Sequence, residues 1–117
     1  MKVLIVDDSR YIRNTIRSTL EQHGYEIIGE AGNGEKAIDL AIKLEPDIIT
    51  LDYILPDMTG IDVLKALKQR KNKSLVLIIS TLGQQSTQQE ALDLGAKHYF
   101  IKPLDHHKLV SIIKTME

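Results

Sequence analysis

Short apolar runs alternate with amphipathic stretches along the whole sequence, and this alternation limits the folds open to the chain. The apolar runs cover residues 2–6, 25–29, 47–51, 74–79 and 97–101. Runs of this length with little polar alternation indicate strands that are covered on both faces. Five such strands alternating with helices predict an α/β fold, a doubly wound parallel sheet, in a single domain over residues 1–117.

The stretches between the runs show helical spacing. The first predicted helix has an apolar face formed by Ile12, Ile16 and Leu20. Its opposite face carries arginines, namely Arg10, Arg13 and Arg17. The fourth predicted helix is the weakest, because residues 84–89 are polar throughout and only Ala91, Leu92 and Leu94 follow to be buried.

Composition excludes several classes of protein. With 15 basic and 16 acidic residues, the net charge of −1 argues against direct nucleic-acid binding by a basic surface. The absence of cysteine excludes disulfides, thiolate zinc sites and a cysteine nucleophile. No apolar run approaches the ~20 residues of a membrane span or the ~7–15 of a signal peptide core. We therefore expect a cytoplasmic protein without membrane insertion.

One basic cluster stands out within the second half of the chain. It consists of Lys65, Lys68, Arg70, Lys71 and Lys73. Such a cluster can meet an acidic partner or a phosphate backbone. The alternative, which we favour, is a solvated helix end whose cations complement the helix dipole.

Reactive side chains follow the predicted strands. Asp7 and Asp8 come after the first strand, Asp52 after the third, Ser80 and Thr81 at the end of the fourth, and Lys102 after the fifth. Because the carboxyl ends of parallel strands meet at one edge of a sheet, these side chains are expected to converge there.

Carboxylates on neighbouring strands, ~4.8 Å apart, would repel one another unless a cation lay between them. Mg²⁺ prefers oxygen ligands and is commonly held by one or two carboxylates. Together with Lys102, such a site suits phosphoryl chemistry in which a carboxylate is the attacking group.

Each of these residues also has an ordinary structural explanation. Asp8 or Ser9 could cap the first helix, and Asp52 could be a turn residue. Ser80 could be a buried hydroxyl bonded to backbone, and Lys102 a surface lysine. These separate explanations do not account for the presence of all these residues at the same edge of the predicted sheet.

The order of these residues resembles the receiver domain of bacterial response regulators. The matching motifs are Asp7-Asp8-Ser9, residues 48–60 around Asp52, Ser80 and Lys102-Pro103, and the resemblance spans essentially the whole chain. It implies a flavodoxin-like (βα)5 fold with strand order 2-1-3-4-5. That order is taken from the family and not from the periodicity of the sequence.

The resemblance also implies the metal-binding and phosphoacceptor roles. Asp52 would be the phosphoacceptor, receiving a phosphoryl group from a histidine kinase or a small phosphodonor. Asp8, Asp52 and the backbone carbonyl of Ile54 would bind Mg²⁺, or Mn²⁺ in its place, while Asp7 would act mainly through water.

The remaining site residues would respond to the phosphoryl group. Lys102 would pair with it, Ser80 beside Thr81 would hydrogen-bond it, and Tyr99 would rotate inward. The Lys102–Pro103 peptide would be cis. The surface changed by these movements would be the fourth helix, the fifth strand and the fifth helix.

Several positions depart from common family choices, among them Leu104, where phenylalanine is common. Thr81 replaces a small residue and would crowd the phosphodonor, while Ile54 and Leu82 are apolar at positions that govern the approach of water. We hypothesise that autodephosphorylation is slow for this reason.

The resemblance implies a two-component signalling switch without substrate turnover of its own, such as a stand-alone chemotaxis or relay regulator, or a domain of a longer one. Its partners would be a histidine kinase or histidine phosphotransfer protein and an unidentified downstream target. We expect a monomer, with dimerisation on phosphorylation left open.

Three alternative functions stay open. They are a flavin-binding flavodoxin-like protein, an aspartate-nucleophile phosphatase, and a receiver that acts unphosphorylated as an interaction module.

Overall fold

The computed structural model describes residues 1–117, which form one parallel sheet with helices on both faces. The strands appear in the order β2-β1-β3-β4-β5, which confirms the fold expected from the resemblance. Along the chain the elements are β1 (Lys2–Val6), α1 (Arg10–Gln22), β2 (Glu26–Ala31), α2 (Gly34–Leu44), β3 (Ile48–Asp52), α3 (Gly60–Gln69), β4 (Leu75–Ser80), α4 (Gln85–Asp93), β5 (His98–Ile101) and α5 (His106–Thr115).

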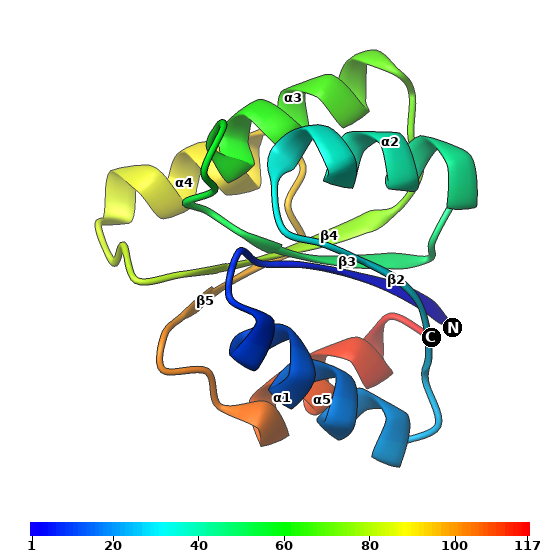
Figure 1. Ribbon diagram of the computed structural model, residues 1–117. Coiled ribbons are helices and arrows are strands. Elements are labelled where there is room, and N and C mark those ends of the chain that lie inside the picture. The colour runs from blue at the N-terminus through cyan, green and yellow to red at the C-terminus, as the bar shows by residue number, and fades with distance from the viewer.

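The helices lie in two layers. α1 and α5 cover one face of the sheet, while α2, α3 and α4 cover the other (Figure 1). Alternate residues of one strand therefore serve two cores: Leu4 and Val6 of β1 belong to a cluster of 17 buried residues, and Val3 and Ile5 to a cluster of 12. Burial on both sides explains why the strands read as continuous apolar runs.

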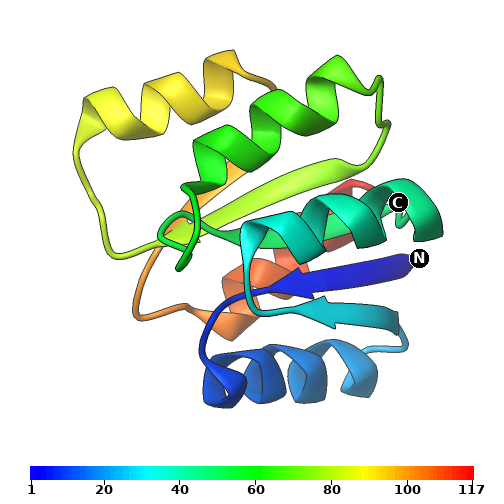
Figure 2. The ribbon, with the colours of Figure 1, turned by 45° about the horizontal axis from the view of Figure 1, so that its top comes forward.

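The sequence misplaces the end of β2. The apolar run predicts this strand over residues 25–29, but the strand runs from Glu26 through Ala31. Glu30 pairs with Ile5 and Ala31 with Val6, so pairing to β1 carries β2 further than its own apolar run indicates. Figure 2 shows β1 and β2 side by side, ending at the same edge.

Two features of the helices match their sequence patterns. α4 is largely solvated, since Ala91 is its only buried residue and no side chain caps its start at Gln84. In contrast, α3 ends among the basic cluster, with Lys68 in its last turn and Arg70 as its C-cap. Cations at this end complement the helix dipole, which supports the structural reading of the cluster. None of the helices combines the length and apolar character needed to cross a membrane.

Candidate functional site

Three carboxylates meet where β1 and β3 end. Asp7 and Asp8 follow β1, and Asp52 is the last residue of β3, the strand that pairs with β1. One oxygen from each carboxylate lies within 4.8 Å of the others. Asp7 and Asp52 are 2% and 6% exposed, whereas Asp8 is exposed. The fold thus builds an acidic pocket with one side open to solvent.

The carboxylates differ in how fully their oxygens are bonded. Asp7 accepts from the backbone N–H of Ser9 (2.9 Å) and from Lys102 Nζ (3.0 Å). Asp52 accepts from the N–H of Ile54 (3.3 Å) and from Lys102 Nζ (3.3 Å). The helix cap is supplied by Ser9, whose hydroxyl accepts from the N–H of Ile12, so Asp8 is not used as a cap. The exposed Asp8 carboxylate lies in the acidic cluster and does not cap α1.

Lys102 opposes part of the negative charge. Its ammonium bridges Asp7 and Asp52 across the pocket. Burial raises the pKa of Asp52, the charge of Asp7 raises it further, and Lys102 lowers it without reversing the shift. Burial lowers the pKa of Lys102, but the hydrogen bonds and charges of Asp7 and Asp52 outweigh it and leave that pKa raised. One ammonium among three carboxylates leaves the pocket negatively charged.

The carboxylate set fits a hard divalent cation. Oxygen ligands from Asp8 and Asp52 with Asp7 beside them are the donors that Mg²⁺ prefers. Ile54 lies in the loop just after Asp52, where it forms an isolated antiparallel bridge with Thr59. Its side chain is 51% exposed at the edge of the site. These residues are the candidates for holding the metal.

A second group of residues links the pocket to α4 and β5. The buried hydroxyl of Ser80 accepts from the backbone N–H of Leu82 (2.9 Å). Tyr99 is 8% exposed, and its hydroxyl donates to the backbone carbonyl of Leu82 (2.7 Å). Tyr99 thus occupies the inward position here, and Ser80 is bonded to backbone. Thr81, which lies between Ser80 and Leu82 in the sequence, is exposed.

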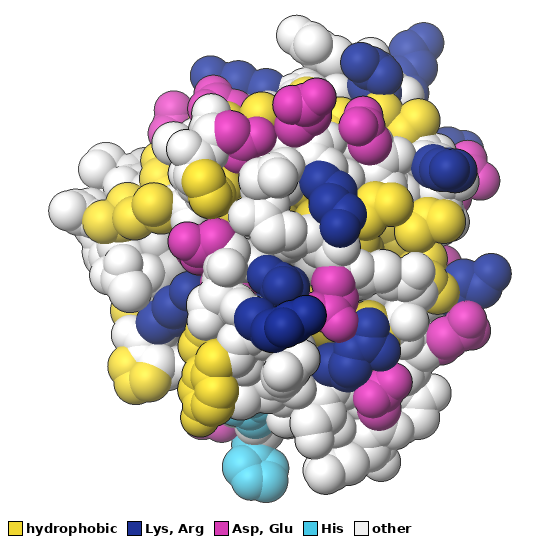
Figure 3. All heavy atoms as spheres, viewed as in Figure 1, with side chains coloured by type: hydrophobic (Ala, Val, Ile, Leu, Met, Phe, Trp, Pro, Cys, Tyr) yellow, Lys and Arg dark blue, Asp and Glu magenta, His cyan; other side chains and the backbone are white.

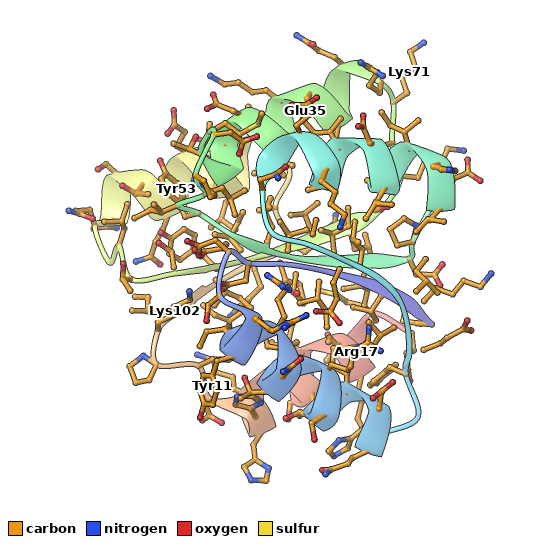
Figure 4. All side chains as sticks on the ribbon, viewed as in Figure 1. Tyr11, Arg17, Glu35, Tyr53, Lys71 and Lys102 are labelled. Atoms are coloured by element: carbon orange, nitrogen blue, oxygen red, sulfur yellow. The ribbon has the colours of Figure 1, made fainter.

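The β5 end completes the site. Lys102 follows β5 directly, and the Lys102–Pro103 peptide is cis. Figure 4 shows Lys102, Tyr53 and Tyr11 at the same end of the sheet, whereas Lys71 of the basic cluster lies far from them. All the residues singled out from the sequence are therefore at one edge, and the basic cluster is elsewhere.

Sequence reasoning missed two contacts behind the pocket. Arg13 of α1 donates to the backbone carbonyl of Asp7 (2.6 Å) and to Glu30 (3.0 Å). Asp57 accepts from the backbone N–H groups of Gly34 and Glu35, which joins the loop after β3 to α2. The arginines on the polar face of the first helix are visible in the sequence, but Glu30 lies beyond the apolar run 25–29 that predicts the second strand.

Comparisons with known proteins agree with this geometry. The family model described as the response regulator receiver domain matches residues 3–114. The chemotaxis protein CheY of Thermotoga maritima is 36% identical over 115 residues, covering 98% of this chain and 96% of that protein. The CheY of Bacillus subtilis is 35% identical over 116 residues, covering 98% and 97%.

A solved structure gives the same result. The chain is similar to a structure described as the CheX-CheY-BeF3-Mg+2 complex from Borrelia burgdorferi, with a TM-score of 0.94 and 32% identity over 99% of this chain and 88% of that chain. A flavodoxin-like sheet with this acidic edge defines a phosphorylation-dependent signalling domain. The chain belongs to the response regulator receiver family of two-component systems.

Proposed function

We propose that this protein is a switch whose Asp52 takes a phosphoryl group from a phosphohistidine of a kinase or phosphotransfer protein, or from a small phosphodonor, in a reaction that requires Mg²⁺. The observation that carries the proposal is the convergence of Asp7, Asp8 and Asp52 within 4.8 Å, with Lys102 bonded to two of them. Family membership favours this activity over flavin binding or phosphatase turnover.

The transfer follows from the positions of the side chains. A carboxylate oxygen of Asp52 attacks phosphorus, a new O–P bond forms, and the bond from phosphorus to the donor nitrogen breaks as the imidazole leaves. Mg²⁺ bound by Asp8, Asp52 and the Ile54 carbonyl would neutralise charge on the phosphoryl oxygens. Lys102 exchanges its contact with the Asp52 carboxylate for one with a phosphoryl oxygen.

The output follows from the shared partner of Ser80 and Tyr99. When the Ser80 side chain turns so that its hydroxyl donates to a phosphoryl oxygen, its oxygen moves away from the N–H of Leu82, which then loses its acceptor. Because the Tyr99 hydroxyl is bonded to the carbonyl of Leu82, a shift of that backbone also moves Tyr99. The surface formed by α4, β5 and α5 would change in consequence, and a downstream protein would read it.

In this proposal the protein is a signalling component without independent substrate turnover, and it acts in the cytoplasm as a monomer. The Borrelia relative is described in complex with CheX, so at least one receiver that is similar to this chain binds a protein partner. The polar face of α4 supplies little apolar area for a phosphorylation-dependent dimer.

Intact mass after incubation with Mg²⁺ and a small phosphodonor tests the proposal. We expect one added phosphoryl group on wild type and none on Asp52→Asn, and none on wild type when a chelator removes the metal. Asp39→Asn, an exposed acid on α2, is the matched control and should be modified like wild type. Failure of several donors to modify wild type would instead favour an unphosphorylated interaction module.

A further inference from the structure

A largely buried arginine holds the backbone between the two acids that follow β1, Asp7 and Asp8. Arg13 Nη1 donates to the carbonyl oxygen of Asp7 at 2.6 Å, and Arg13 Nε donates to Glu30 Oε1 at 3.0 Å. The arginine side chain is 17% exposed. A single guanidinium therefore connects the acidic loop to the carboxyl end of β2.

The carbonyl that Arg13 contacts belongs to the peptide linking Asp7 to Asp8. The orientation of this peptide sets the direction in which the chain leaves β1, and with it the relative directions of the two carboxylates. On the other side of the residue, the N–H of Asp7 donates to the carbonyl of Ala31 at 3.0 Å. The backbone of Asp7 is thus held by β2 at its N–H and by Arg13 at its carbonyl.

Glu30 holds the arginine in this direction. Its two oxygens accept from different arginines, Oε1 from Arg13 and Oε2 from Arg17. Burial raises the pKa of Glu30, but the hydrogen bonds and charges of Arg17 and Arg13 outweigh it and lower the pKa overall. Figure 3 shows basic and acidic side chains interleaved in the middle of this face of the molecule.

Arg17 attaches α1 to the sheet through Glu30 but does not contact the acidic loop. It lies one turn further along α1, bonds Glu30 at 2.7 Å and Glu21 at 3.2 Å, and makes no hydrogen bond to Asp7. If Arg13 is lost, Arg17 still joins α1 to Glu30. The contact that no other side chain replaces is the one to the Asp7 carbonyl.

We propose that Arg13 is a positioning residue for the metal site: it orients the Asp7–Asp8 peptide so that the carboxylates of Asp8 and Asp52 face one cation. Arg13 acts through the backbone and touches neither the metal nor the phosphoryl group. This inference rests on the proposed function, because it assigns a role in the same Mg²⁺ site. Outer contacts of this kind typically contribute ~10–100-fold to metal affinity.

Calorimetric titration with Mg²⁺ alone, without a phosphodonor, tests the role of Arg13. We expect Arg13→Met to raise the Kd for Mg²⁺ about tenfold. Arg17→Met is the matched control, since it removes the other arginine partner of Glu30 without touching Asp7, and its Kd should stay within about twofold of wild type. Thermal unfolding of both variants reports the structural loss, which we expect to be similar for the two.

A conservative variant keeps the test decisive if Arg13→Met does not fold. Arg13→Lys keeps the charge but lacks the planar fork that reaches both partners, so we expect a Kd raised about threefold. A Kd within about twofold of wild type for the folded Arg13 variants, or an equal loss in Arg17→Met, would overturn the inference and leave Arg13 a helix-attachment residue. Absence of Mg²⁺ binding by wild type would instead remove the proposed function, and this inference with it.

Discussion

At the scale of single residues, two apolar side chains lie near Asp52, the proposed phosphoacceptor. Ile54 follows Asp52 by two residues and is 51% exposed, and Leu82 follows Ser80 at the same spacing and is half-buried. Neither side chain can hydrogen-bond a water molecule and orient it toward phosphorus. We therefore expect the phosphorylated form to hydrolyse slowly.

Replacement of these two residues should shorten the lifetime of the phosphorylated form. The variant Ile54→Asn with Leu82→Glu supplies an amide and a carboxylate that can orient water, so we expect decay to accelerate about tenfold, less than the ~10²–10⁴-fold of a well-positioned general base. Loss of phosphoprotein mass after removal of the donor measures the rate. Leu92→Glu, at an exposed apolar position on α4, should leave decay unchanged. Equal decay of the double variant and wild type would contradict the explanation.

At the scale of elements, the start of α2 is built against the loop that follows β3. Asp57 accepts from the N–H of Gly34 (2.8 Å) and of Glu35 (3.0 Å), bonds that lower the pKa of the Asp57 carboxyl. The side chain of Met58 fills the space that a Cβ on Gly34 would need, overlapping it at both Cγ and Sδ. A Cβ at position 34 would therefore displace the Met58 side chain, so close packing between this loop and the helix favours glycine there.

Substitution of Gly34 should reveal this packing. Gly34→Ala forces Met58 to move, and overpacking of this kind costs about 1–3 kcal/mol of unfolding free energy. That loss exceeds the gain of up to ~1 kcal/mol from the better helix propensity of alanine. In a Met58→Ala background the same substitution should be neutral or stabilising. Urea unfolding of the four proteins measures the coupling, and an identical effect of Gly34→Ala in both backgrounds would refute it.

At the scale of the whole molecule, folding brings together negative charges from distant parts of the chain. Asp7, Asp8 and Asp52 converge with Lys102 as the single opposing ammonium. A cation that binds this set binds the folded chain and not the unfolded one, because the set exists only after folding. Mg²⁺ should therefore stabilise the entire domain.

Thermal unfolding with and without Mg²⁺ measures this stabilisation. At ten times its Kd, Mg²⁺ should add ~1.4 kcal/mol to the free energy of unfolding. For a domain of this size we expect Tm to rise by about 4–8 °C, and a chelator should reverse the rise. Asp8→Asn should abolish the effect, whereas Asp39→Asn should retain it. A rise of equal size in Asp8→Asn would show that Mg²⁺ acts elsewhere.

Much of the site was predictable because parallel strands deliver their carboxyl ends to one edge. Asp7, Asp8, Asp52, Ser80 and Lys102 each follow an apolar run that is long enough to be recognised as a strand. Their convergence needs only the direction of the strands, which the alternation of strand and helix already implies. The order of the strands was taken from the family resemblance, because pairing between distant segments leaves no periodic mark in the sequence.

The sequence by itself determined the two-sided sheet and which side chains lie at its chemical edge, since both follow from the local pattern of apolar residues. Only the tertiary structure decided which of these side chains touch: Lys102 bonds Asp7 as well as Asp52, and Ser9, not Asp8, caps α1. It also decided that β2 continues through Glu30 to Ala31. Pairing with β1 places Glu30 where it can hold Arg13 against the Asp7 carbonyl. Such contacts join residues far apart in the chain, so they depend on strand register and helix placement and are invisible to local pattern.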